Sequence, residues 1–211
     1  MRHLTIMLKP ASGMCNMRCT YCFYAGESRK RSVPSYGFMS DATLTQVIKK
    51  SLAVATESCS LCFQGGEPTL AGLDYFQRAV ELAQTWNVNS CALSFALQTN
   101  GLRLDEAWCA FLAQNHFLVG VSLDGTKDLH DANRVDAVGK GTHSRVMASL
   151  RLLRRYRVDT NILTDLTGNL CRNFRKVYRF YAQHSLDYQQ YIPCLDPLGE
   201  PRGEYPWSLT P

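Results

Sequence analysis

Short apolar runs alternate with longer amphipathic stretches along almost the whole chain. The apolar runs fall at residues 4–8, 59–64, 91–97, 117–123, 158–163 and 188–192. Most are rich in β-branched or apolar residues and lack a clean polar alternation, which is typical of strands buried on both faces. We therefore predict six β-strands.

Five stretches between these runs carry apolar residues at the three- and four-residue spacing of a helix. Ser40 and Asp105 precede the first and third stretches as predicted N-caps. The stripes consist of Leu44, Val47, Ile48 and Leu52; Leu73, Phe76, Val80 and Ala83; Trp108, Phe111 and Leu112; Val146, Leu150 and Leu153; and Phe174, Val177, Tyr178 and Tyr181.

Regular alternation of strand and helix predicts parallel strands joined by helical crossovers, and so an α/β fold. Six strands and five helices fit either a partial α/β barrel or a doubly wound sheet. In both folds the chemistry lies at the carboxyl ends of the strands. The loops that follow each predicted strand are therefore the places to search for a site.

The composition fits one large domain or two small ones and excludes several classes of protein. The chain has 211 residues, of which 45% are hydrophobic and 19% charged. No apolar run approaches the roughly 18 residues of a membrane-spanning helix, and the N-terminus lacks a secretory pattern. The net charge of +5 is dispersed. We expect a cytoplasmic protein that binds neither membranes nor nucleic acid, with its basic helix faces solvated; a nucleic-acid patch is the alternative.

The cysteines are the most informative residues. The chain has nine of them, an odd number, so reduced thiols are a better expectation than disulfides. Cys15, Cys19 and Cys22 follow the first predicted strand with the spacing C-x3-C-x2-C. Three thiolates can hold three irons of a [4Fe–4S] cubane and leave the fourth iron open. No fourth ligand follows at zinc spacing; zinc or an unligated loop are the alternatives.

Glycine-rich and polar motifs follow the next strands. Gln64-Gly-Gly-Glu-Pro68 follows the second strand, Gln98-Thr-Asn-Gly101 ends the third, and Ser122-Leu-Asp-Gly125 ends the fourth. Asn133-Arg-Val-Asp136 comes shortly afterwards. Gly-Gly and Asn-Gly are also ordinary turn sequences, so each motif is weak alone. Their order along the chain is the stronger signal.

The ordered motifs resemble those of the radical SAM enzymes and, more narrowly, of the anaerobic sulfatase-maturating enzymes. The similarity covers essentially the whole chain and rests on CNMRCTYCFY, FQGGEPTLAG, LQTNG, GVSLDG, HDANRVD, GKGTH and IPCLDPLGE. It implies a partial (β/α)6 barrel of the radical SAM type over residues 1–195 and an extended tail over 196–211. It also implies two cofactors, a [4Fe–4S] cluster and S-adenosylmethionine.

The resemblance assigns roles to particular residues. Cys15, Cys19 and Cys22 would be the cluster ligands, with Tyr21 as the aromatic residue of the signature. The remaining assignments are Gly66 at the amino group of the cofactor's methionine part, Ser122 and Arg134 at its ribose and carboxylate region, and Leu195 beside its adenine. Tyr24 and Gln64 are candidates for a peptide-facing mouth, although tyrosine here is equally compatible with packing.

The resemblance also implies a reaction. Reductive cleavage of S-adenosylmethionine would give a 5′-deoxyadenosyl radical, which takes a Cβ hydrogen from a Cys or Ser of a sulfatase polypeptide. Loss of a second electron then leads to Cα-formylglycine. A one-electron donor such as flavodoxin or ferredoxin would be a partner. Other peptide-modifying enzymes of this kind, or a non-catalytic cluster-binding fragment, are the alternatives.

One departure from the resembled family limits the assignment. Its members continue into a cysteine-rich SPASM domain with auxiliary clusters, and a proposed catalytic aspartate lies there. The sequence stops at Pro211, so we expect a truncated product and assign no catalytic residue. The six scattered cysteines are interpreted as small core residues, with Cys59 and Cys62 on opposite faces of one strand.

Overall fold

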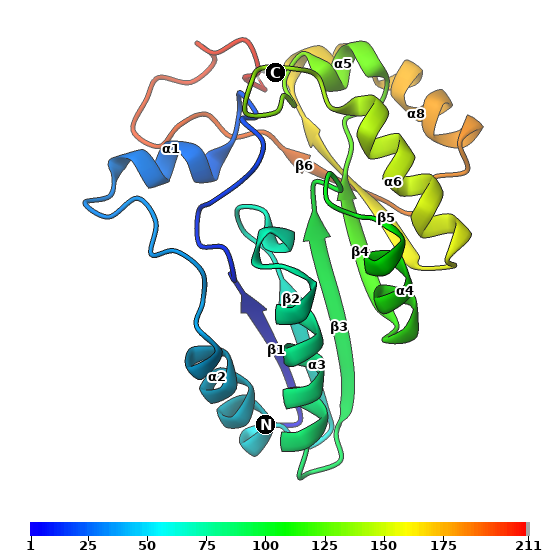
Figure 1. The fold of residues 1–211 in the computed structure, drawn as a ribbon. Coiled ribbons are helices and arrows are strands. Elements are labelled where there is room, and N and C mark those ends of the chain that lie inside the picture. The colour runs from blue at the N-terminus through cyan, green and yellow to red at the C-terminus, as the bar shows by residue number, and fades with distance from the viewer. Residues whose placement is uncertain (210–211) are drawn as a thin grey trace.

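The computed structural model describes residues 1–209, apart from the side chain of Arg29. Six parallel strands form a single curled sheet in the order β1-β2-β3-β4-β5-β6 (Figure 1). A doubly wound sheet would reverse its strand order at a switch point, so the sequential order identifies a partial barrel. The strands are His3–Leu8 (β1), Ser58–Phe63 (β2), Ala92–Thr99 (β3), Phe117–Ser122 (β4), Asp159–Leu166 (β5) and Gln189–Pro193 (β6).

All six predicted strands and all five predicted helices are confirmed. The N-caps are confirmed as well, because Ser40 accepts a hydrogen bond from the Thr43 amide (3.2 Å) and Asp105 accepts one from the Trp108 amide (3.0 Å). The five predicted helices are Asp41–Val54 (α2), Leu73–Trp86 (α3), Glu106–Gln114 (α4), His143–Arg155 (α6) and Phe174–Gln183 (α8).

Four further helical segments were not predicted. They are α1 (Phe23–Lys30), the 3-10 helix Pro68–Ala71, α5 (Lys127–Asp131) and α7 (Gly168–Arg172). Three of them have only four or five residues, too few to show a helical stripe. The sequence of α1, FYAGESRK, is polar behind its two aromatic residues and has no stripe either.

The strands are buried on one face rather than on two, so that expectation is wrong. On β2, Cys59, Leu61 and Phe63 are buried, whereas Ser60 and Cys62 are only half-buried. The buried set packs with the apolar stripes of the helices in one core, and the other set faces the barrel interior. Cys59 and Cys62 therefore lie on opposite faces, as predicted, and only Cys59 is a core residue.

Aromatic rings fill the centre of this core. Phe63 lies 4.7 Å from Phe76 and 6.3 Å from Phe117 between ring centroids, and Phe95 stacks on Phe117 at 5.1 Å. Because β2, β3 and β4 contribute one ring each and α3 contributes Phe76, the cluster fixes the middle of the sheet. The loops at the carboxyl ends of the strands are held on this rigid base.

The segment after β6 folds back instead of extending. Residues 196–209 form turns without a helix or strand. The carboxylate of Asp196 accepts hydrogen bonds from the Gly203 amide (2.9 Å) and the Ser208 hydroxyl, and Lys30 Nζ donates to Leu198 O (2.9 Å). Residues 196–209 of the predicted tail thus form a turn held by these contacts, and residues 210–211 lie outside the described residues.

In the described part of the chain, no helix is both long enough and apolar enough to cross a membrane. All nine cysteines are free thiols, as expected. The carboxyl ends of the strands, α1 and the end of the chain lie at the upper edge of the sheet in Figure 1. The predicted site residues come from these loops.

Candidate functional site

The three closely spaced cysteines lie in the segment that joins β1 to α1. Cys15 is exposed, Cys19 and Cys22 are half-buried, and Cys22 is the N-cap residue of α1. Although part of Cys15 is exposed, its sulfur is in contact with Met17 and Asn100, and loss of water around the sulfur raises the pKa of the Cys15 thiol to about 11; burial raises that of the Cys19 thiol to about 12. These thiols keep their protons at neutral pH, so a metal centre that binds them has to displace the protons.

Hydrogen bonds fasten this cysteine loop to residues 133–136. The Thr20 amide donates to Asn133 O (3.0 Å), and the Thr20 hydroxyl donates to Asn133 Oδ1 (2.7 Å). Met17 and Asp136 form an antiparallel β-bridge. The motif at 133–136 therefore shapes the cysteine loop, a role that the sequence did not reveal.

The Gly-Gly-Glu-Pro loop after β2 supports the cysteine loop from another direction. Gly66 has φ +59°, and a Cβ atom on it would lie only 2.3 Å from Met14 O. The next residue, Glu67, donates its amide to the same oxygen (2.8 Å). Gly66 is therefore required for the close approach of two loops, whatever its contact with a cofactor.

The Glu67 carboxylate is almost completely buried and nevertheless accepts four hydrogen bonds. Thr69 donates through its amide (3.0 Å) and its hydroxyl (2.6 Å), Thr99 through its hydroxyl (2.7 Å) and Asn100 through its amide (2.7 Å). Burial raises the pKa of Glu67, and these donors oppose the shift by stabilising the charged form. Glu67 thus joins the end of β2 to the end of β3.

Arg134 lies between two aspartates that end neighbouring strands. Its Nε atom is 2.9 Å from Asp124 Oδ2, and its Nη2 donates to Asp165 Oδ2 (2.6 Å). The Nε–H makes no hydrogen bond of good geometry, although it is buried. Tyr21 also donates its hydroxyl to Asp124, and its ring centre lies 5.5 Å from the guanidinium carbon. Burial, which outweighs the attraction of Arg134, raises the pKa of Asp165.

A buried histidine, His130, connects Asp124 to Arg134 through hydrogen bonds. His130 Nδ1 accepts a hydrogen bond from the Asp124 amide (3.2 Å), so its proton is on Nε2, which lies 2.9 Å from Thr142 Oγ1. The Thr142 hydroxyl in turn donates to Arg134 O (2.9 Å). Burial, followed by repulsion from Arg134, lowers the pKa of His130 to about 3, so the ring is neutral. The motifs HDANRVD and GKGTH are joined by this chain of hydrogen bonds.

All eight residues singled out from the sequence line one cavity of about 360 Å³ at the carboxyl edge of the sheet. Gln98 donates to the Ser122 hydroxyl there (3.3 Å), and Leu195 lies at the rim with 71% of its surface exposed. Tyr24, Gln64, Glu67, Asn100 and Asp165 also line the cavity. The eight predicted residues are Cys15, Cys19, Cys22, Tyr21, Gly66, Ser122, Arg134 and Leu195.

Asp165 and Glu67 are two charged cavity residues that the sequence did not reveal as site residues. Asp165 is the penultimate residue of β5, and the predicted strand ended at residue 163. The position of Asp165 could have indicated a site residue, because folds of this class place their chemistry at the carboxyl ends of parallel strands. Glu67 was hidden inside a motif interpreted only through its glycines.

The donor set fits an iron–sulfur cluster better than a single metal ion. A tetrahedral zinc site brings all its ligands to within about 2.3 Å of one atom. Among residues 1–209, no group of three or more His, Cys, Asp or Glu side chains converges in a way that could hold one ion. The three thiols nevertheless line one cavity, and in a cubane each thiolate binds a different iron.

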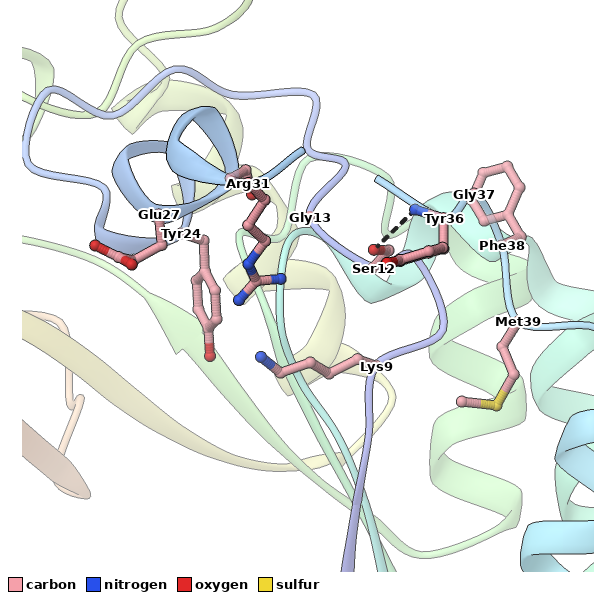
Figure 2. A pocket seen from close by; sticks show the side chains of 11 residues that line it. Lys9, Ser12, Gly13, Tyr24, Glu27, Arg31, Tyr36, Gly37, Phe38 and Met39 are labelled. Atoms are coloured by element: carbon pink, nitrogen blue, oxygen red, sulfur yellow. Dashed lines mark hydrogen bonds between the residues drawn. The ribbon is translucent and has the colours of Figure 1, made fainter. Parts of the chain in front are cut away.

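A smaller pocket of about 260 Å³ lies beside α1, and Tyr24 lines both spaces. Figure 2 shows Lys9 and Arg31 reaching toward Tyr24, whereas Glu27 points away. The ammonium of Lys9 lies 4.4 Å from the centre of the Tyr24 ring, a cation–π contact. Tyr24 is therefore held at the wall of the larger cavity, which is compatible with both of its predicted roles.

The chain matches the family model of the Radical SAM superfamily over residues 10–180. It therefore belongs to this superfamily, whose members use a [4Fe–4S] cluster and S-adenosylmethionine, and the predicted cofactor pair is confirmed at that level.

Within this superfamily, the chain is similar to anaerobic sulfatase-maturating enzymes. The cysteine-type anaerobic sulfatase-maturating enzyme of Clostridium perfringens is 45% identical over 208 residues, which cover 99% of this chain and 56% of that enzyme. The enzyme of the same name from Clostridium novyi is 41% identical over 100% of this chain and 56% of its own length. The serine-type enzyme of Klebsiella aerogenes is 30% identical over 90% of this chain and 46% of its own length. The chain thus spans a little over half the length of its cysteine-type relatives.

Solved structures of similar proteins have the same fold over almost the whole of this chain. The structure described as native anSMEcpe with bound AdoMet superimposes with a TM-score of 0.94 at 45% identity, over 98% of this chain and 56% of that one. Streptococcus suis SuiB, at 16% identity and a TM-score of 0.67, shares the fold. The prediction of a partial radical SAM barrel is therefore confirmed.

Proposed function

We propose that residues 1–195 form the cofactor-binding core of an anaerobic sulfatase-maturating enzyme. The proposed activity is the oxidation of a Cys or Ser on a sulfatase polypeptide to Cα-formylglycine. The observation that carries the proposal is the convergence of all eight predicted residues on one cavity at the carboxyl edge of the sheet. The identity of 41–45% to enzymes of that name supports it.

Within that cavity we assign Cys15, Cys19 and Cys22 as cluster ligands. When bound, the cluster supplies the electron that cleaves the sulfonium of S-adenosylmethionine. The protein's part is to hold the cofactor and exclude water. Arg134 lines the cavity with its buried guanidinium, and Ser122 presents a hydroxyl that accepts a hydrogen bond from Gln98. Both groups are suited to a ligand that carries carboxylate and hydroxyl oxygens.

A cysteine target is favoured over a serine target. The two clostridial relatives at 41% and 45% identity are named cysteine-type, whereas the relatives at 29% and 30% identity are named serine-type. The sequence by itself left this choice open. The peptide would enter past Tyr24 and Gln64, which line the cavity.

The remaining partners follow from the chemistry. Cleavage of the cofactor needs one electron, so a donor such as flavodoxin or ferredoxin is part of the proposal. Nine free thiols are typical of a reducing compartment, which supports a cytoplasmic location. The proposal includes no nucleic acid and no membrane.

The test is an anaerobic assay of the reconstituted protein with S-adenosylmethionine, dithionite and a synthetic sulfatase peptide containing the target cysteine. Mass spectrometry follows both 5′-deoxyadenosine and the peptide. Formation of 5′-deoxyadenosine supports the cofactor-binding core, and formylglycine in the peptide supports the whole proposed activity; deoxyadenosine with an unmodified peptide would limit this chain to the cofactor-binding part. Deoxyadenosine with a peptide modified in another way would favour a different peptide-modifying radical SAM enzyme. An intact cluster without deoxyadenosine would indicate a non-catalytic module.

A further inference from the structure

Asn100 lies at the end of the sequence Gln98-Thr-Asn-Gly101, which the sequence reasoning treated as a turn as readily as a site. In the fold its side chain is largely buried and reaches the cysteine loop. The Asn100 Nδ2 atom lies 3.7 Å from Cys15 Sγ and 2.8 Å from Asn16 Oδ1. It is therefore a hydrogen-bond donor to the sulfur of a proposed cluster ligand.

The orientation of this amide is fixed by the rest of the turn. Asn100 Oδ1 accepts a hydrogen bond from the Leu102 amide (3.0 Å). A flipped amide would place an NH2 group against that donor, so the oxygen has to face Leu102 and the nitrogen has to face Cys15. The donor role at the sulfur thus follows from the hydrogen-bond network.

Glu67 anchors the backbone of the same residue. Its Oε2 accepts the Asn100 amide (2.7 Å), and its Oε1 accepts the hydroxyl groups of Thr69 (2.6 Å) and Thr99 (2.7 Å). The Glu67 amide is bound to Met14 O, directly before Cys15. Both ends of the contact between Asn100 and Cys15 are therefore held by one buried carboxylate residue.

Cys15 Sγ accepts a second hydrogen bond from the Met17 amide (3.3 Å). Donors to a cluster sulfur stabilise the additional negative charge of the reduced state, and they are one of the determinants of cluster potential. The donor at position 17 is a backbone amide, which almost any residue there would supply. The donor of Asn100 belongs to its side chain. Asn100 is thus the part of this arrangement that substitution can test.

We infer that Asn100 is a positioning residue for the cluster, which orients Cys15 and raises the reduction potential by donating to its sulfur. The inference rests on the assignment of Cys15 as a cluster ligand in the proposed function. Asn100 acts through Cys15. Its contribution is to make the cluster easier to reduce and to keep Cys15 in place.

The test is a redox titration of the reconstituted protein, followed by electron paramagnetic resonance, in the parent and in Asn100→Ala. We expect Asn100→Ala to keep its iron content and to become harder to reduce. The reduction equilibrium should shift by about tenfold, the lower end of second-shell effects, or about 59 mV for a one-electron couple. An unchanged potential in a fully loaded variant would overturn the inference.

Asn133→Ala is the matched control. It removes an asparagine that binds the same loop through Thr20, and no hydrogen bond joins its side chain to a sulfur among the contacts of the described residues. We expect the cluster of Asn133→Ala to have the same reduction potential as that of the parent. An equal shift in Asn133→Ala would show that loosening of the loop is sufficient, and the assignment to Asn100 would fail.

A second measurement detects the hydrogen bonds to the cluster directly. In the reduced parent, electron–nuclear double resonance in H2O and D2O should detect exchangeable protons coupled to the cluster. Asn100→Ala should lose part of that signal and keep the part due to the Met17 amide. If the parent assembles no cluster, the proposed function fails; if it does and the proton signal is the same in both proteins, only the role of Asn100 fails.

Discussion

The Nε atom of Arg134 lies 2.9 Å from Asp124 Oδ2, and the exposed fractions of the two side chains are only 6% and 2%. Asp165 occupies the other side of the guanidinium. A resemblance alone suggests an arginine that is free to bind a cofactor carboxylate. In the fold the same guanidinium also neutralises two protein carboxylates, so its removal affects more than cofactor binding.

We expect Arg134→Ala to lower the free energy of unfolding by about 3–5 kcal/mol, because it leaves buried carboxylates without their partner. Urea denaturation measures this. Arg145→Ala is the control, since Arg145 forms an exposed ion pair with Asp136 (3.0 Å) and its loss should cost at most about 1 kcal/mol. Cofactor contact by Arg134 stays a prediction, and a folded variant that binds S-adenosylmethionine as well as the parent would contradict it.

The three cysteines should be individually essential for the cluster. Anaerobic reconstitution of the parent should give about four irons and four sulfides per chain, and Cys15→Ala, Cys19→Ala or Cys22→Ala should each abolish stable loading. Cys171→Ala is a suitable control, because Cys171 is a half-buried thiol in α7 that does not line the cavity. Tight, air-stable zinc in the parent would refute the cluster.

Gly66→Ala should disrupt the cysteine loop. Gly66 has a positive φ of +59°, and the new methyl group would meet Met14 O at 2.3 Å, so the loop has to move. We expect a loss of about 1–3 kcal/mol in stability and a lower iron content. Gly26→Ala in α1 should be neutral or slightly stabilising, because nothing lies within 4 Å of its added Cβ. Iron analysis and thermal unfolding of both variants would compare the two positions.

Acid should destabilise the fold through His130. The pKa of this ring is about 3 in the fold, against an ordinary value of about 6.5, so the unfolded chain takes up a proton first as the pH falls. The contribution of His130 to stability is therefore present above pH 6.5 and is lost on going from pH 6.5 toward pH 3. Between about pH 7 and pH 5 the loss should be about 2 kcal/mol.

The comparison of parent and His130→Gln isolates this effect from the other titrating groups near the ring, Arg134, Asp124, His143 and Asp131. Both proteins are unfolded with urea at each pH. The variant should be less stable at neutral pH and should lose less stability on acidification. Parallel pH profiles would mean that folding does not lower the pKa of His130 and would contradict this prediction.

The periodicity of the sequence was sufficient for the regular elements, because the five long helices and the central strands β2–β5 contribute buried apolar residues to one core. The periodicity was misleading about the burial of the strands. An apolar run such as Ser58–Phe63 of β2 has the same composition whether protein covers one face of the strand or both. The sequence left a partial barrel and a doubly wound sheet as alternatives. The order of the strands in the sheet decides between them, and this order depends on pairing between segments that are distant in sequence.

The site was predictable where residues belong to a motif and unpredictable where they act through contacts. Cys15 was identified by the cysteine spacing after a strand, and Ser122 by a motif at the end of a strand that the resembled family shares. Asp165 and His130 were not, because their importance depends on the side chain of Arg134 and on the amide of Asp124, which are remote in sequence. Asn100 was identified only as a turn, since nothing local indicates that its amide reaches Cys15.

The fastening of the cysteine loop has a consequence for the biogenesis of the protein. Thr20 is separated from its partner Asn133 by 113 positions, and Met17 pairs with Asp136. During synthesis, the first 22 residues leave the ribosome long before these partners exist, so the ligands cannot yet hold their final arrangement. Insertion of a cluster should therefore follow translation of the first four strands, and machinery that delivers iron and sulfide would meet a largely folded sheet instead of a nascent chain.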